Sequence, residues 1–358
     1  MLSKIFWTFT SIFLLSLIFI FIIIFFDLFD SNFKKVENAI YYKAQNIKAF
    51  NLNKNKLKIM TWNIKFGAGR IDMFFDCHGK REIIKKEEVI NNLNNISEKI
   101  KEIAPDVLFL QEVDIKSNRT ANIDEAQYIL DNTDLNYGYY ASQWKSIFIP
   151  SHNIAKVNTG SLILSKYPLK DGKRYSLPTI GSQNLIVQYF YLKRNFLKTK
   201  LEINQHKITL ITTHLSAYAQ DETKERQINQ IENYINGLSQ DKHEFILGGD
   251  FNILPPGTKK VKNFPDSVCK GEFEADDFSN QTELLSSIYN SQNSAIKLSD
   301  YQNNNEKYFT HTTDKNGFWN RKIDYIFSNG KLENAKVLQK GTMKLSDHAP
   351  ITVDYILE

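Results

Sequence analysis

Two stretches of the chain repeat apolar residues at the three- and four-residue spacing of an amphipathic helix. In residues 85–103 one helical face carries Ile90, Leu93, Ile96, Ile100 and Ile103. In residues 222–238 one face carries Ile228, Ile231 and Ile235. A helix with a single apolar stripe buries it against a neighbouring layer, so both stretches are predicted to be helices that cover a sheet.

Short apolar runs alternate with these helices, and such runs are typical of buried strands. Residues 186–191 and 199–203 are expected to pair as antiparallel strands, and residues 261–308 to form a polar surface excursion with a short helix near residues 281–289. This mixture predicts an α/β fold of the α+β kind, with two packed mixed sheets and helices outside them. The other predicted strands are residues 57–64, 106–113, 160–169, 207–215, 244–252, 322–329 and 349–357.

The apolar run near the N-terminus has a different character, because residues 5–26 contain no charged side chain. A helix of about 20 apolar residues spans the hydrocarbon core of a bilayer. The run exceeds the ~7–15 apolar residues of a secretory signal, which is the alternative, and no small-residue cleavage site follows it. We therefore predict one transmembrane helix in an uncleaved single-pass anchor over residues 1–30, a polar tether over 31–56 and a catalytic domain over 57–358. Lysines flank the span on both sides in nearly balanced number, and its short N-terminal tail favours an extracytoplasmic catalytic domain.

Composition changes this picture little. The chain has 358 residues, of which 42% are hydrophobic and 24% charged, as in globular proteins. Its formal charge of +5 is a weak indication of an anionic partner. Cys77 and Cys269 stand in no zinc-ligand spacing, so two free thiols are expected, with a single disulfide as the alternative.

Polar side chains stand beside the predicted strands: most follow the end of an apolar run, while Asp324 lies within residues 322–329 and Asp347 and His348 precede residues 349–357. Strand ends gather at one rim of a layered fold, so these groups are expected to converge on one cleft. Each also has an ordinary explanation: a turn for Asn63, a core histidine for His214, an ion pair for Glu112 or Asp324. Together they favour a shared site, because buried charge is costly unless it is paired or metal-bound. The residues are Asn63, Glu112, His214, Asp250, Asn252, Asp324, Asp347 and His348.

These residue types suit cleavage of a phosphate ester. Mg²⁺ takes hard oxygen ligands, which Glu112 and Asn63 can supply. His348 is the right type of residue to activate a water molecule, and Asp324 is the candidate to orient it. His214 could donate a hydrogen bond to the phosphate, while Asp250 and Asn252 position water and a phosphate oxygen.

Six motifs carry a resemblance to a known family. TWNI, LQEVD, TTHL, GGDFN, KIDYIF and SDHAP occur in this order between residues 57 and 358. The chain thereby resembles the endonuclease/exonuclease/phosphatase superfamily, and His214 in TTHL is similar to its deoxyribonuclease-I-like and neutral sphingomyelinase-like branches.

The resemblance implies a four-layer sandwich and a Mg²⁺-dependent site, with Mn²⁺ as the alternative ion. It implies that Asn63 and Glu112 bind the metal and that Asp347 joins them. It places Asp250 and Asn252 around the scissile phosphate and pairs Asp324 with His348, so that Asp250 rivals His348 as the base.

Three further features bear on the substrate. Arg119 could contact a substrate phosphate, and a salt bridge is the equal alternative. Residues 189–195 mix aromatic and basic side chains and are expected to form an exposed hairpin. Phe318 and Trp319 could stack on a base, dip into lipid or pack in the core.

The preferred function is a membrane-anchored, divalent-metal-dependent phosphodiesterase that acts as a monomer by metal-assisted in-line attack of water. A phospholipid headgroup or a similar group is the expected substrate, and the membrane is a partner through the N-terminal helix. A nuclease acting on nucleic acid is the second hypothesis, although no dense basic stripe with interleaved aromatics is present. An inositol-phosphatase-like phosphomonoesterase and an inactive interaction module are further alternatives, the last disfavoured by the complete residue set.

Overall fold

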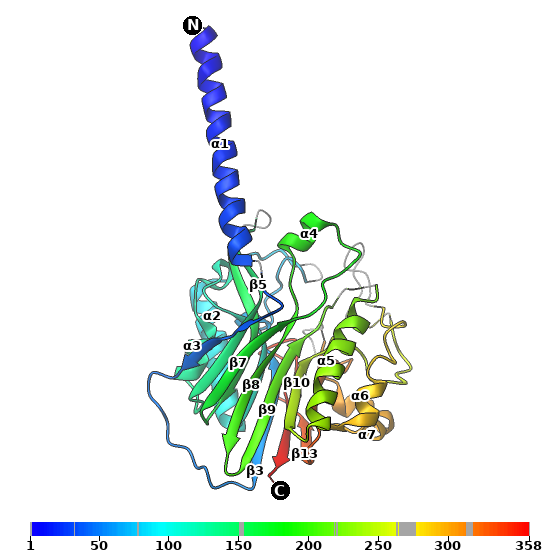
Figure 1. The fold of residues 1–358 in the computed structure, drawn as a ribbon. Coiled ribbons are helices and arrows are strands. Elements are labelled where there is room, and N and C mark those ends of the chain that lie inside the picture. Colours follow the sequence, from blue (N-terminus) through cyan, green and yellow to red (C-terminus); the bar gives the residue numbers. More distant parts are fainter. Residues whose placement is uncertain are drawn as a thin grey trace.

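The strands of the computed structural model form two sheets that pack face to face, with helices on the outer face of each (Figure 1). The structure describes the chain except residues 1, 32, 77–78, 150–153, 218, 220, 263, 265–276, 313–317 and 358, and except the side chains of residues 2–3, 26–31 and 186. Cys77 and Cys269, predicted to be free thiols, lie outside the described residues. The predicted class, two packed mixed sheets flanked by helices, is confirmed.

Each sheet has seven strands in the described part of the chain. Both sheets are antiparallel except for one parallel pair each, β9 with β10 and β3 with β4. In spatial order the first sheet comprises β1 (Val36–Asn38), β7 (Leu169–Ser176), β8 (Asn195–Ile203), β9 (His206–His214), β10 (Glu244–Asp250), β12 (Asp324–Ser328) and β11 (Asn293–Ser294). The second comprises β13 (Leu332–Val337), β14 (Ile351–Ile356), β3 (Lys56–Asn63), β4 (Val107–Asp114), β6 (Ala155–Ser165), β5 (Tyr137–Ile149) and β2 (Ile40–Lys43).

Alternating apolar residues along the strands divide the interior into three cores. On β3, Ile59 points between the sheets while Met60 and Trp62 point towards the helices. The helices α2 (Lys86–Ile103) and α3 (Glu125–Asp131) cover the second sheet, and α5 (Thr223–Gln240) and α6 (Ser286–Ser291) cover the first. Three buried cores between four layers match a sandwich of helices, sheet, sheet and helices. The chain also forms α7 (Leu298–Asn303) and three short 3₁₀ turns, η1 (Lys65–Gly67), η2 (Asn118–Thr120) and η3 (Asn305–Tyr308).

Two successive glycines allow close approaches beside the site, one between the two sheets and one between neighbouring strands of the first sheet. A Cβ atom on Gly248 would lie 2.6 Å from a ring carbon of Phe109 on the opposite sheet. Gly249 has φ +152°, and a Cβ there would lie 2.0 Å from the carbonyl oxygen of Thr213. Two successive positions without side chains are therefore needed where β10 enters the site.

The N-terminal helix α1 (Leu2–Ser31) extends away from the sandwich (Figure 1). Within it, Lys4–Phe25 is long and apolar enough to cross a bilayer, and none of it is buried. A signal sequence near an N-terminus would meet the same criteria of length and composition.

The segment predicted as a polar tether, residues 31–56, contains two short strands, β1 and β2. β1 pairs with β7 at the edge of one sheet, and β2 pairs with β5 at the edge of the other. These strands are short and largely exposed, with little of the apolar alternation that marks a buried strand.

Another strand prediction is also wrong, because residues 185–190 form the helix α4 (Leu185–Phe190). The Asn184 side chain accepts a hydrogen bond from the Val187 backbone N–H at 2.9 Å and caps the helix. Consequently β8 pairs with β7 and β9, and residues 189–195 form no hairpin. The helix expected near residues 281–289 is confirmed in part as α6, which begins at Ser286.

Candidate catalytic site

The strand register brings the predicted polar residues to one edge of the sandwich. On the first sheet Asp250 lies opposite both His214 on β9 and Asp324 on β12. On the second sheet Asn63 ends β3 opposite Gln111, directly before Glu112 on the parallel strand β4. Parallel strands end at a common edge, so both sheets contribute side chains to one site.

The first part of the site is a buried group of Asp250, Asp324 and His348. His348 Nδ1 lies 2.9 Å from Asp324 Oδ2, and His348 Nε2 lies 3.6 Å from Asp250 Oδ2. The histidine is held from both sides: its backbone N–H donates to Ser346 Oγ at 3.1 Å, and its carbonyl accepts from Trp62 Nε1 at 2.8 Å. The predicted pairing of Asp324 with His348 is therefore present in the structure.

The charges of this group perturb one another. Burial alone lowers the pKa of His348, but Asp324 and Asp250 outweigh it and raise that pKa to about 10. Burial raises the pKa of Asp250 to about 7, and Asp324 adds to this while His348 opposes it. An imidazole between two carboxylates is favoured in its protonated form. The two carboxylates thus favour the imidazolium form of His348.

Asn63 connects the two halves of the cleft. Its Nδ2 donates to Glu112 Oε1 at 3.1 Å and to Asp250 Oδ2 at 3.1 Å. Its Oδ1, the atom expected to bind a metal, accepts from the Lys65 backbone N–H at 3.0 Å. In this arrangement the amide orients both carboxylates.

Glu112 stands on a local irregularity of β4. Its φ is +53°, and the β4–β6 register shifts between Leu110 and Val113. A left-handed conformation is unusual for glutamate, and such strain often marks a functional position. Burial and the negative charge of Asp347 raise the pKa of Glu112, so a cation between them would relieve their repulsion.

Asp347 has a cationic neighbour that the sequence pattern did not indicate. Lys65 Nζ lies 2.7 Å from Asp76 Oδ2 and 3.6 Å from Asp347 Oδ2. Burial by itself raises the pKa of Asp347, but Lys65 and His348 lower it well below its usual range. Asp76 follows no apolar strand, and Lys65, which comes directly after the strand predicted over residues 57–64, was not singled out.

His214 and Asn252 complete the set around Asp250. His214 Nε2 lies 3.4 Å from Asp250 Oδ2, and burial holds the pKa of His214 well below its usual value, so it is neutral. Its buried Nδ1 has no hydrogen-bond partner among the described residues. The Asn252 backbone N–H donates to Asp250 Oδ1 at 2.9 Å, while its Nδ2 donates to the Leu215 carbonyl at 3.1 Å.

Arg119 forms the salt bridge that was the alternative to a substrate contact. Its Nε and Nη2 donate to the two oxygens of Asp114 at 2.8 and 2.9 Å. The guanidinium also lies 3.8 Å from the centre of the Phe66 ring, and the side chain is buried. Because the guanidinium is engaged in this bidentate ion pair and ring contact, Arg119 supports the structure beside Glu112.

His311 is a second site neighbour that sequence reasoning missed. Its ring centre lies 4.6 Å from that of His348, and the two residues form an isolated backbone bridge. It belongs to a loop without an apolar run before it, so no strand-end pattern pointed to it.

The described residues fit a divalent cation. Ligand atoms of Asp250, Asp324 and His348 lie within 4.8 Å of one another, and the buried Asp324 Oδ1 has no hydrogen-bond partner in the described part of the chain. A histidine must be neutral to bind a metal, so His348, whose protonated form is favoured, is a poor metal ligand. Glu112 and Asp347, which repel each other, form the better carboxylate pair.

A hollow of about 1010 Å³ lies next to the cleft beyond Arg321 and Leu254. Phe318 and Trp319 line it, and Phe318 is 44% exposed, so they are not packed in the core. Arg321, at another wall, stacks 4.0 Å from the centre of the Phe264 ring.

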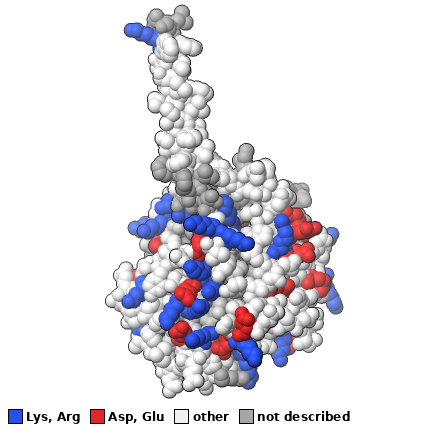
Figure 2. All heavy atoms as spheres, viewed as in Figure 1, with Lys and Arg blue, Asp and Glu red and all other residues white. Residues whose placement is uncertain are grey.

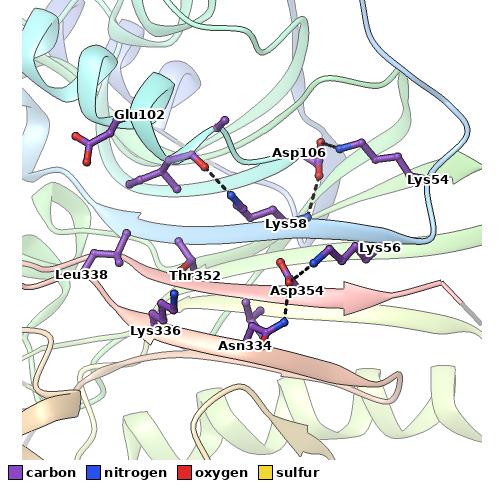
Figure 3. A pocket seen from close by; sticks show the side chains of 13 residues that line it. Lys54, Lys56, Lys58, Glu102, Asp106, Asn334, Lys336, Leu338, Thr352 and Asp354 are labelled. Atoms are coloured by element: carbon purple, nitrogen blue, oxygen red, sulfur yellow. Dashed lines mark hydrogen bonds and ion pairs between the residues drawn. The ribbon is translucent and has the colours of Figure 1, made fainter.

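A second hollow, of about 630 Å³, lies at the opposite edge, where β3 and β4 begin (Figure 3). Three of its lysines are engaged: Lys54 contacts Asp106 at 2.7 Å, Lys56 contacts Asp354 at 2.8 Å, and Lys58 donates to the Ile103 carbonyl at 3.0 Å. None of the strand-end residues lines it.

Comparison with protein families agrees with this geometry. Residues 60–348 match the model of the endonuclease/exonuclease/phosphatase family. The chain belongs to this family. No curated protein matches the chain. Members of the family are metal-dependent phosphoester hydrolases.

Solved structures share the fold of this family member. An endonuclease/exonuclease/phosphatase from Beutenbergia cavernae has a TM-score of 0.57 at 16% identity, over 85% of this chain and 72% of that one. The human Nocturnin catalytic domain has a TM-score of 0.54 at 20% identity, over 88% and 97%. A functionally unknown protein from Enterococcus faecalis has a TM-score of 0.54 at 14% identity, over 83% and 98%. At these identities the likeness shows the fold alone.

Proposed function

We propose that this chain is a membrane-anchored, Mg²⁺-dependent phosphodiesterase that hydrolyses its substrate by in-line attack of water. The observation that supports this most is the convergence on Asp250 Oδ2, which lies 3.1 Å from Asn63 Nδ2, 3.4 Å from His214 Nε2 and 3.6 Å from His348 Nε2. A carboxylate so placed can accept a proton from a water molecule, and the cationic imidazole beside it can donate a hydrogen bond to a phosphate oxygen.

The metal would be held by Glu112, Asp347 and Asn63, with Mn²⁺ as a substitute for Mg²⁺. When bound, it polarises the phosphoryl group and offsets charge on the leaving oxygen. Hard oxygen donors of this kind suit Mg²⁺, which keeps several of its waters in protein sites.

Asp250 is the group we assign as the base, in preference to His348. His348 carries a proton at neutral pH, so it can donate to a phosphate oxygen but cannot accept a proton from water. Asp324 holds the imidazolium through Nδ1 at 2.9 Å and keeps Nε2 directed at Asp250. His214 and Asn252 orient Asp250 and the substrate around it.

Site variants test this assignment on the synthetic diester bis-p-nitrophenyl phosphate. Asp250→Asn and His348→Ala in the full-length protein are each expected to lose about 10²–10⁴-fold in kcat, the usual contribution of acid–base groups. Lys336→Ala, in the distant hollow, is the control and should retain full activity. Circular dichroism must show that the fold survives. Two site variants with near wild-type rates would contradict the proposal.

The substrate class we propose is a phospholipid headgroup, because the apolar helix α1 would hold the site near a bilayer. Sphingomyelin vesicles and plasmid DNA tested side by side separate this from the nuclease alternative. Faster hydrolysis of the vesicles supports the lipid assignment, whereas faster nicking of the plasmid would replace it. Activity on a phosphomonoester alone would contradict both diester readings.

A further inference from the structure

We infer that the surface around the catalytic edge of the sandwich is a bilayer-docking surface, so that this edge faces the lipid surface from which α1 emerges. The surface consists of Ile147 and Phe148 near the end of β5, and Leu185 and Val187 on α4. The inference rests on the membrane anchoring proposed above and adds to it an orientation and a second contact with lipid.

Topology places both apolar elements at the catalytic edge. β6 pairs with β4 so that Thr159 lies opposite Asp114, just beyond Glu112, and residues 147–149 and 155 extend further in the same direction. The helix α4 precedes β8, whose Phe196 lies opposite Thr213, one residue before His214. Both elements therefore rise from the edge at which the metal- and phosphate-competent residues end.

The side chains are exposed although they are apolar. Leu185 is 83% exposed, Val187 43%, Phe148 42% and Ile147 37%. Burying apolar side chains of this size stabilises, so leaving several of them in water at one edge is unfavourable without a covering partner. Lipid at the headgroup boundary is such a partner for short apolar elements.

This edge is also where α1 leaves the sandwich. The Tyr189 hydroxyl at the end of α4 donates to the Ile24 carbonyl of α1 at 3.4 Å. Figure 1 shows α4 beside the foot of α1, at the same end of the molecule. The exposed apolar side chains of β5 and α4 are thus next to a helix that is long and apolar enough to cross a bilayer. Lipid is therefore the partner that we infer covers them.

The charges at this edge suit a lipid surface. Lys34 and Lys35 are exposed directly after α1, and Lys156 is exposed at the start of β6. Figure 2 shows Lys and Arg side chains on the sandwich beside the foot of α1, while residues 5–25 of α1 carry no charged side chain. Juxtamembrane lysines are attracted to anionic headgroups. A lipid phosphodiester at the interface would therefore face the cleft.

Depth-dependent quenching in proteoliposomes tests this orientation. The full chain, with Cys77→Ser and Cys269→Ser, would carry a fluorescent label at Leu185→Cys or, as a matched control, at Leu52→Cys. Leu52 is 50% exposed but belongs to the loop before Lys54, whose Nζ contacts Asp106 at the opposite edge. Lipids with a quencher on the acyl chain should quench the label at 185 and leave the label at 52 unchanged. Equal, weak quenching at both positions would overturn the inference.

A second variant links docking to turnover. Leu185→Glu with Val187→Glu is expected to lower the rate on phospholipid vesicles at least about tenfold while the rate on bis-p-nitrophenyl phosphate stays unchanged. Leu52→Glu should alter neither rate. An unchanged vesicle rate in the double variant would contradict the inference. If no form hydrolyses any diester but the label at 185 is still quenched, the docking surface stands and the proposed function fails.

Discussion

His348 carries the proton in this site, and its neighbours are the reason. Its imidazole lies between Asp324 and Asp250, and the ring of His311 packs beside it. Lys65 lies beside the neighbouring Asp347. Four carboxylates, those of Glu112, Asp250, Asp324 and Asp347, thus share one cleft with few fixed cations. Such an excess of buried negative charge is unfavourable unless a metal compensates it.

The pH dependence of hydrolysis follows from these charges. Asp250 must be ionised to accept a proton, and its pKa is raised to about 7, so kcat/KM should rise with pH through about 7 and level off above that value. His348 must keep its proton, and its pKa is raised to about 10, so the rate should fall again above that value. A rate profile from pH 5 to 11 measures both limbs. A profile that falls as pH rises from 5 to 7 would contradict the assignment of Asp250 as base.

Arg119 should act on stability more than on substrate binding. Removing it by Arg119→Met leaves the buried Asp114 carboxylate unpaired, which costs about 3–5 kcal/mol for a broken buried ion pair. Urea unfolding should show this loss, whereas Arg70→Met, at a partly exposed position, should lose less. Unchanged stability together with a raised KM would instead support the phosphate contact first considered for Arg119.

At this scale the sequence was informative where a polar residue ends an apolar strand. Asn63, Glu112, His214 and Asp250 stand at or near the ends of such strands, and Asp324 begins one; all five converge in the structure. Lys65 begins the 3₁₀ turn η1, and Asp76 and His311 lie outside the regular elements, where no periodicity fixes a residue's position in space. Whether Arg119 points to substrate or to Asp114 depends on side-chain packing, which a linear pattern does not contain.

Among the elements, β10 has the tightest constraint, because Gly248 faces Phe109 across the two sheets. Gly248→Ala is expected to destabilise the fold by about 1–3 kcal/mol through overpacking. The Gly237→Ala control lies on α5, where an added Cβ meets nothing within 4 Å, and it should stabilise by about 0.5–1 kcal/mol. Denaturant midpoints compare the two. A neutral Gly248→Ala would show that the sheets can separate without cost.

Long periodic elements were predicted well, and short apolar runs were not. α2 and α5 lie within a residue or two of the predicted helices, since four or more turns define a face clearly. The run LIVQYF has the composition of a strand, yet the Asn184 cap and its place at an exposed edge make it the helix α4. β1 and β2 were missed because pairing with a partner strand, and not their own pattern, holds them in place.

At the scale of the whole molecule, the two sheets supply different halves of one site. His214, Asp250 and Asp324 belong to the first sheet, while Asn63 and Glu112 belong to the second. The apolar helix α1 and the exposed side chains of α4 lie at the same edge as this site (Figure 1). A metal-dependent phosphodiesterase held at a lipid surface accounts for both features together.

Hydrolysis of bis-p-nitrophenyl phosphate with and without chelator tests this account most directly. The purified full-length protein should cleave the diester in Mg²⁺ or Mn²⁺, lose its activity in EDTA and regain it when either ion is restored in excess. Glu112→Gln should require a higher Mg²⁺ concentration for half-maximal rate, because it removes a charged ligand. Activity that persists undiminished in EDTA would contradict the central claim that this cleft acts through a divalent metal.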